Sequence, residues 1–188
     1  MSFYGGDFYT ISDETSELVC GAGTNNANNA HVIQALRCEG PYCDNVSVRC
    51  VAGSQGASRA SVTWSGWFGA GQSAECADGE FVQGFDCSGS HCSEMRIACA
   101  PFGEWNIEHC AWTNTGFSEE ESDLDHPDAD TYDDNEEYSE TWNDAAYFGH
   151  DGYSDGRGYF LAGIRCDGSR CDEKKFKVCR PPLPVADD

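Results

Sequence analysis

The segment FVQGFDCSGSHCSEMRIAC, residues 81–99, decides the fold, because the chain contains its pattern three times. In this segment an apolar run leads into a CxGxxC loop, and a run of alternating apolar residues then ends in a further cysteine. The pattern recurs in VIQALRCEGPYCDNVSVRC (32–50) and in FLAGIRCDGSRCDEKKFKVC (160–179). Alternation with a period of two is typical of a half-buried strand. Each copy therefore predicts a β-hairpin with a glycine in its loop.

The residues between the hairpins predict how the repeats are organised. Trp64 and Trp112 precede the second and third hairpins at matching positions, so each unit is expected to contain a Trp-bearing strand, a loop and a hairpin. None of these units can bury its apolar face alone. We therefore expect an all-β fold of three pseudo-symmetric repeats, β-prism-like or trefoil-like. The predicted single domain (1–188) comprises repeats at 1–50, 51–99 and 100–180, an acidic insertion at 118–141 and a C-terminal tail at 181–188.

The twelve cysteines indicate a disulfide framework. They lack the further Cys or His at ligand spacing that a zinc site needs. The two cysteines that flank each hairpin loop are expected to bond, and the other six then join a preceding loop to the last strand of a hairpin. The predicted pairs are Cys38–Cys43, Cys87–Cys92, Cys166–Cys171, Cys20–Cys50, Cys76–Cys99 and Cys110–Cys179. The third copy has one additional residue before its last cysteine, which predicts a β-bulge in that strand. This disulfide-stapled framework favours an extracellular location.

Two resemblances agree with this interpretation. The second repeat resembles the vitelline membrane outer layer protein I family, which is built from three repeats on a β-prism; the matching residues are Cys76, Gly79, Phe81, Gly84, Phe85 and Cys99. That family lacks the CxGxxC loop. The chain also resembles Cys-rich repeats of secreted bacterial proteins, through GFSEE (116–120) and CEGPYCDNVSVRC (38–50). Both resemblances imply a secreted β protein, and neither implies a reaction.

The charge of the chain limits its partners. It has 33 acidic and 11 basic side chains, a formal net charge of −22. Phosphate binding needs clustered Lys and Arg, so we expect no nucleic-acid partner. No apolar run is long enough to cross a bilayer, so we expect no membrane insertion. Cations, basic partners or neutral glycans fit this charge. Lys174, Lys175 and Lys177 form one run, expected on a solvated strand face or paired with the acidic insertion.

The acidic insertion has two interpretations. Residues 118–140 hold twelve acidic side chains and no Lys or Arg. Ca²⁺ takes roughly six to eight oxygen ligands, which such a loop could supply. The candidate ligands are Asp123, Asp125, Asp128, Asp130 and Asp133. Their spacing is not that of an EF-hand, and a solvated acidic loop is the other interpretation. Ca²⁺ is the one cofactor that the sequence suggests.

Aromatic side chains are the candidate ligand contacts. Trp67, Tyr147 and Phe148 lie next to predicted loops, where their rings could stack on a sugar. Trp64 and Trp112, at matching repeat positions, are expected in the core. The motifs HExxH, GxGxxG and the P-loop are absent. GYSDG (152–156) has the letters of GxSxG, but it lies in the Gly-rich loop 151–158, which precedes a predicted strand and not the helix of a nucleophile elbow, so a turn is the default interpretation. We therefore assign no catalytic residue and expect no enzyme. The predicted function is an extracellular binding module for a glycan or another ligand at a cell surface or in a matrix.

The alternative function is a structural subunit that self-assembles into an extracellular filament or coat. The segment SFYGGDFYTI (2–11) alternates aromatic residues with glycine, and such a strand could add to the sheet edge of a neighbouring subunit. The competing interpretation is that this segment packs within its own chain, as the first repeat's equivalent of the Trp-bearing strands.

Overall fold

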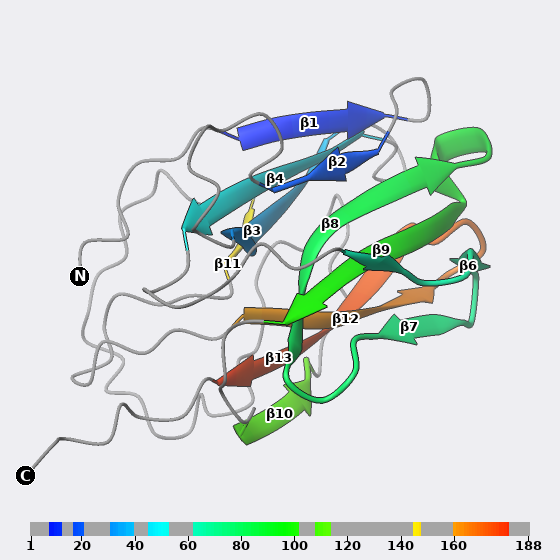
Figure 1. The fold of residues 1–188 in the computed structure, drawn as a ribbon. Helices are drawn as coiled ribbons and strands as arrows, with labels where there is room; N and C mark the ends of the chain where they lie inside the picture. The colour runs from blue at the N-terminus through cyan, green and yellow to red at the C-terminus, as the bar shows by residue number, and fades with distance from the viewer. Residues whose placement is uncertain are drawn as a thin grey trace, which may run out of the picture.

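The computed structural model is all-β, and its strands form three antiparallel sheets (Figure 1). It describes residues 8–12, 17–20, 31–39, 45–52, 62–101, 108–113, 145–147 and 160–180. Besides strands, these residues include a single 3-10 turn, η2 (Ser90–Cys92). None of them belongs to a helix with the length and apolarity that a membrane crossing requires.

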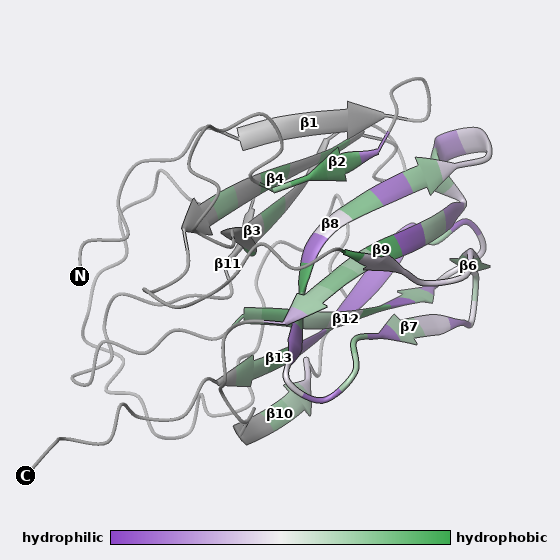
Figure 2. Ribbon diagram, viewed as in Figure 1, coloured by the Kyte–Doolittle hydropathy of each residue, from purple (hydrophilic) through white to green (hydrophobic). Residues whose placement is uncertain are grey.

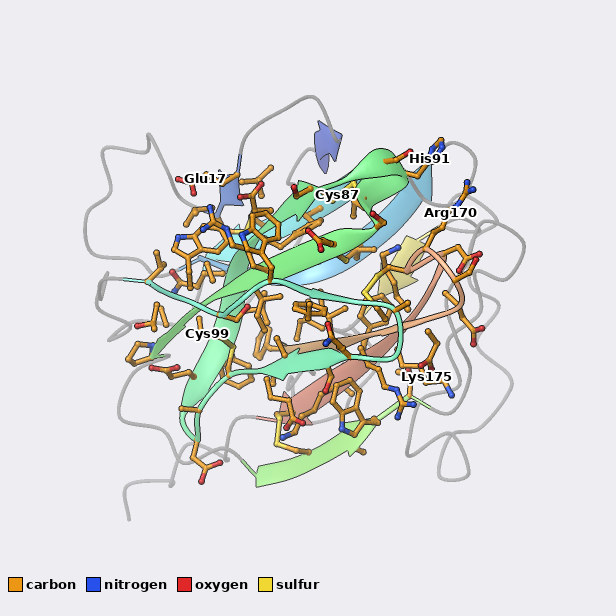
Figure 3. All side chains as sticks on the ribbon, turned by 90° about the vertical axis from the view of Figure 1, so that its right-hand side faces the viewer. Glu17, Cys87, His91, Cys99, Arg170 and Lys175 are labelled. Carbon is orange, nitrogen blue, oxygen red and sulfur yellow. A yellow bond between two sulfur atoms is a disulfide. The ribbon has the colours of Figure 1, made fainter. Side chains whose placement is uncertain are left out.

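A long hairpin forms the middle of each sheet, as the repeat pattern predicts. The hairpins are β3 (His31–Glu39) with β4 (Asn45–Ala52), β8 (Glu80–Ser88) with β9 (Glu94–Pro101), and β12 (Phe160–Asp167) with β13 (Glu173–Arg180). The loops of the second and third hairpins, marked by His91 and Arg170, lie at the same end of the molecule (Figure 3).

The register of each hairpin shifts by one residue on its first strand, between Ile33 and Ala35, Val82 and Gly84, and Leu161 and Gly163. The bulge predicted in the last strand of the third repeat is therefore wrong. β13 pairs with β12 without an added residue of its own, and the irregularity lies in β12. The additional residue of the third copy instead moves Cys179 one position farther along its strand, opposite Phe160.

Shorter strands complete the sheets at their edges. They are β1 (Phe8–Ser12), β2 (Leu18–Val19), β5 (Thr63–Trp64), β6 (Phe68–Gly69), β7 (Ser73–Glu75), β10 (Glu108–Trp112) and β11 (Ala145–Tyr147). The sheet orders are β1-β4-β3-β11, β2-β8-β9-β5 with β6 also on β9, and β10-β13-β12-β7. The second strand of each hairpin thus pairs with a strand that precedes its own hairpin. The first strand of each hairpin pairs with a strand that precedes one of the other two hairpins.

The core lies where the three hairpins meet. Strands β3, β8 and β12 contact one another pairwise. The inward side chains of the three hairpins form one buried cluster that includes Ile33, Leu36, Phe85, Ile97, Ile164 and Phe176. Figure 2 shows hydrophilic and hydrophobic residues alternating in the first half of β9, as a half-buried strand requires, and hydrophobic residues in its second half, where the strand is buried. Burial of this apolar surface is the main driving force for bringing the three hairpins together.

Five disulfide bonds coincide with predicted pairs: Cys20–Cys50, Cys76–Cys99, Cys87–Cys92, Cys110–Cys179 and Cys166–Cys171. Two of them close hairpin loops. Cys20 follows β2 and Cys50 lies in β4, so this bond joins two sheets, and the bond from Cys76 to Cys99 likewise joins two sheets. The sixth predicted pair, Cys38–Cys43, includes a residue outside the described ranges.

We expect peptide mapping without reduction to recover the Cys38–Cys43 bond, because the equivalent cysteines of the other two hairpins are bonded. Full reduction should then add twelve hydrogens to the intact mass, one for each cysteine of the chain. The measurement is mass spectrometry before and after reduction. Alkylation of Cys38 and Cys43 in the unreduced, denatured protein would contradict this prediction.

Candidate functional site

Trp67 is the most exposed large hydrophobic side chain in the described part of the chain, at 45% exposure. It lies between β5 and β6, which both pair with β9. The loop is held to β9 through Ser65, whose N–H donates to the Ile97 carbonyl at 2.9 Å. The Ile97 N–H in turn donates to Ser65 Oγ at 3.0 Å. These two bonds fix the backbone from which the Trp67 side chain projects.

Arg96 of β9 contacts both tryptophans of the segment Trp64-Ser-Gly-Trp67. Its Cζ lies 4.6 Å from the ring centre of Trp64 and 4.8 Å from that of Trp67. Both distances are within the roughly 6 Å range of a cation–π contact. The prediction that Trp64 and Trp112 belong to the core is wrong, because each is only half-buried. The strand of Trp64 lies at the edge of the sheet, where its indole packs on Arg96 instead.

Two carboxylates surround the same guanidinium. Asp86 stands opposite Arg96 in the β8–β9 register, and its Oδ2 accepts from Arg96 Nε at 3.0 Å and from Nη2 at 2.8 Å. Glu17, which precedes β2 and is labelled in Figure 3, accepts a longer bond from Arg96 Nη2, at 3.4 Å. The Asp86 side chain is 12% exposed and that of Glu17 is 50% exposed. Asp86 therefore orients Arg96, whereas Glu17 faces solvent.

We name Trp64, Trp67, Arg96, Asp86 and Glu17 the tryptophan–arginine site. An exposed indole supported by a fixed guanidinium offers a rigid flat surface for an apolar ring. The neighbouring carboxylates accept hydrogen bonds, so the site combines one stacking surface with a few polar groups. Because Arg96 is already held by Asp86, binding would cost little ordering of these side chains.

Lys174 lies in the core, although the sequence predicts it on a solvated strand face or paired with the acidic insertion. It is fully buried, opposite Cys166 in the β12–β13 register, and its Nζ donates to the Cys171 carbonyl at 2.6 Å. Burial lowers the pKa of Lys174 from 10.5 to about 8, and the charge of Asp172 opposes this shift in part. The prediction of a solvated strand face is thus wrong for Lys174. It fits the partly exposed Lys175 and Lys177, which pair with Asp167 and Glu75.

The other predicted site residues are described in part or not at all. The backbone of Tyr147 pairs with Ala35 at the edge of the first sheet. Phe148 and the proposed calcium ligands Asp123, Asp125, Asp128, Asp130 and Asp133 lie outside the described residues, so calcium binding stays a prediction. Within the described ranges no group of three or more His, Cys, Asp or Glu side chains is arranged to hold a metal ion.

Sequence reasoning found Trp67 but missed its neighbours Arg96, Asp86 and Glu17. The sequence does contain one indication of the site, the spacing of Trp64 and Trp67, because two aromatic residues three positions apart can both contact one side chain on a neighbouring strand. Identifying that side chain needs the register between β5 and β9. Comparison of the chain with protein-family models, with curated proteins and with solved structures finds no significant match. The functional interpretation therefore rests on the geometry of the tryptophan–arginine site.

Proposed function

We propose that this protein is an extracellular, non-enzymatic binding module whose ligand is a glycan at a cell surface or in a matrix. The observation that carries this proposal is the 45% exposed indole of Trp67, supported from behind by Arg96. An exposed indole that its neighbours hold in place is a preformed stacking surface, which suits a binding role. The apolar face of a sugar ring can pack on the indole while its hydroxyl groups bond to nearby polar side chains.

The extracellular part of the proposal is supported by the disulfides. Five bonds within the described residues need an oxidising compartment to form and persist. They also make the scaffold rigid, which suits a site that works by presenting one fixed aromatic surface.

We further propose a β-prism-like arrangement of the three sheets, in line with the resemblance to the vitelline membrane outer layer protein I family. Three observations support it. The sheets share one plan, with a hairpin in the middle and a short strand at each edge. Their first hairpin strands contact one another pairwise. The register shift falls at the same place in all three hairpins.

The structural-subunit alternative depends on a free N-terminal strand. In the structure, Phe8–Ser12 pairs along its length with β4 of the same chain. It occupies the place that β5 and β10 occupy on the other two hairpins. This pairing within the same chain favours the binding module over the filament.

The Trp67→Ala variant is expected to bind its glycan at least about tenfold more weakly than the wild type, as for loss of an aromatic residue at the centre of a binding site. A glycan array finds the ligand, and titration calorimetry of the best binder measures the change. Because Trp67 is exposed, the variant should keep its melting temperature to within a few degrees.

Arg165→Ala is the matched control. Arg165 is also a large exposed side chain, but it lies on β12 in another sheet, where it forms an exposed ion pair with Asp167. Its variant should bind like the wild type. Equal affinities for the wild type and Trp67→Ala, or an array without any bound glycan at high protein concentration, would refute the proposed function.

A further inference from the structure

The tryptophan–arginine site has an excess of negative charge. Arg96 is its single cation, and Asp86 and Glu17 both lie against it. The formal charge of these three side chains is therefore −1, in a chain whose net charge is −22. A ligand with sulfate or carboxylate groups would be repelled both by the site and by the long-range field of the protein.

The guanidinium of Arg96 is already engaged within the site, and its side chain is only 29% exposed. Two indole rings lie against it, and Asp86 Oδ2 accepts hydrogen bonds from both Nε and Nη2. Its role is to orient the rings. The most exposed charged group of the site is the carboxylate of Glu17, with its side chain 50% exposed and its bond to Arg96 no shorter than 3.4 Å. Little energy is lost when a ligand cation competes for that carboxylate.

We infer that the glycan bound at this site is an amino sugar with free, protonated amino groups, presented as an oligomer or polymer of hexosamine. This inference rests on the proposed glycan function and names its ligand class. The sugar ring stacks on Trp67, and its ammonium group lies against the carboxylate of Glu17, which bonds to the same Arg96 guanidinium that contacts the indole. An ammonium group near an indole also gains a cation–π attraction. N-acetylation of the sugar removes the charge and with it both interactions.

The test compares three oligosaccharides of equal length: fully deacetylated glucosamine oligomers, their N-acetylated counterparts, and glucose oligomers of the same linkage. Titration calorimetry is done at mildly acidic pH, where the amino groups are protonated, and at two salt concentrations. We expect the amino oligomer to bind at least about fivefold more tightly than the other two. Added salt should reduce this preference, because one of the two attracting charges is exposed.

Glu17→Gln is the discriminating variant, and Glu75→Gln is its matched control. Both carboxylates pair with a cation, at similar exposure of 50% and 44%, and both substitutions change the net charge equally. The preference for the amino oligomer should disappear in Glu17→Gln and persist in Glu75→Gln. If both variants lose it equally, overall charge and not this site is responsible, and the inference is overturned.

The remaining outcomes separate this inference from the proposed function. Equal binding of all three oligosaccharides that is lost in Trp67→Ala would overturn the amino-sugar inference and leave the glycan function intact. Binding of an oligolysine peptide at Trp67 with no binding of any oligosaccharide would overturn both, and would identify a basic protein segment as the ligand.

Discussion

Lys174→Met is expected to stabilise the protein at pH 7 and to remove part of the pH dependence of its stability. Lys174 lies in the core with no exposed surface, and its Nζ donates to the Cys171 carbonyl. Met95 stands opposite Cys87 where Lys174 stands opposite Cys166, so the second hairpin shows that methionine fits this position. An unbranched apolar side chain of similar length can follow the path of the lysine without a charge.

The direction of the effect follows from the lowered pKa. At pH 7 both the folded and the unfolded protein carry the charge, and the lowering of the pKa from 10.5 to about 8 corresponds to a burial cost of about 3 kcal/mol. Losing the bond to Cys171 offsets part of the gain, so the net stabilisation by Lys174→Met is expected to be ~1–2 kcal/mol.

The pH dependence supplies an independent readout. Between pH 8 and 10.5 the unfolded chain holds a proton that folded Lys174 has lost, so the free energy of unfolding of the wild type rises with pH in this range. The variant lacks this gain, and its advantage should shrink as the pH rises above 8. Denaturant titrations of both proteins across this range measure the difference.

Lys175→Met is the control, because Lys175 is partly exposed and pairs with Asp167 at 3.8 Å. Because Lys174 is intact in this variant, its stability should still rise between pH 8 and 10.5. A Lys174→Met variant that is less stable than the wild type at every pH would show that the ammonium group contributes more through its bonds than it costs by burial.

Gly84→Ala is expected to destabilise the protein by more than about 3 kcal/mol, or to prevent folding. A methyl group at Gly84 would overlap the carbonyl oxygen of Leu18 and lie 2.9 Å from the Cα of Val19. Both are backbone atoms of β2, so no side-chain rotation relieves the overlap. Strand β2 cannot simply move away, because the Cys20 N–H bonds to the Gln83 carbonyl at 2.7 Å and Cys20 is bonded to Cys50.

Alanine substitutions at two further glycines, Gly163 and Gly66, are expected to cost less stability than Gly84→Ala. At Gly163, the equivalent position of the third hairpin, the nearest atom to an added methyl is the Ala74 carbonyl oxygen at 3.0 Å, so the alanine variant should lose less. At Gly66 nothing lies within 4 Å, and the variant should melt like the wild type. Thermal melts of the three variants give the order. A Gly84→Ala protein as stable as Gly66→Ala would mean that β2 does not pack on β8 as described.

The hairpins and the disulfides that close their loops were predictable from sequence because they depend on local spacing, and the three longer-range pairs followed from the places of the remaining cysteines in the repeats. Cys87 and Cys92 are separated by 5 positions, and a repeated short loop leaves them few other partners. The strand alternation around them is equally local. Only the all-β class and these pairings follow from such information.

The tryptophan–arginine site could not be predicted in the same way. Arg96 is separated from Glu17 by 79 residues, and their contact exists only because β2 adds to the edge of β8. The burial of Lys174 has the same origin. Its neighbours in sequence suggest a solvated run, whereas its register opposite Cys166 turns it toward the core. The Arg96–Glu17 contact and the burial of Lys174 both depend on the register between strands, which the residue pattern alone does not determine.

The edge strands have a consequence for how the molecule comes apart. β2 precedes the first hairpin and pairs with β8 of the second, β7 precedes the second and pairs with β12 of the third, and β11 returns from the third to pair with β3 of the first. In a linear repeat array, the terminal unit can fray while its neighbour stays folded. Because each repeat contributes an edge strand to the sheet of another repeat, and the third contributes to the first, no repeat is terminal. Loss of any one hairpin removes an edge from the next, so the three sheets are bound into one cooperative unit that melts together.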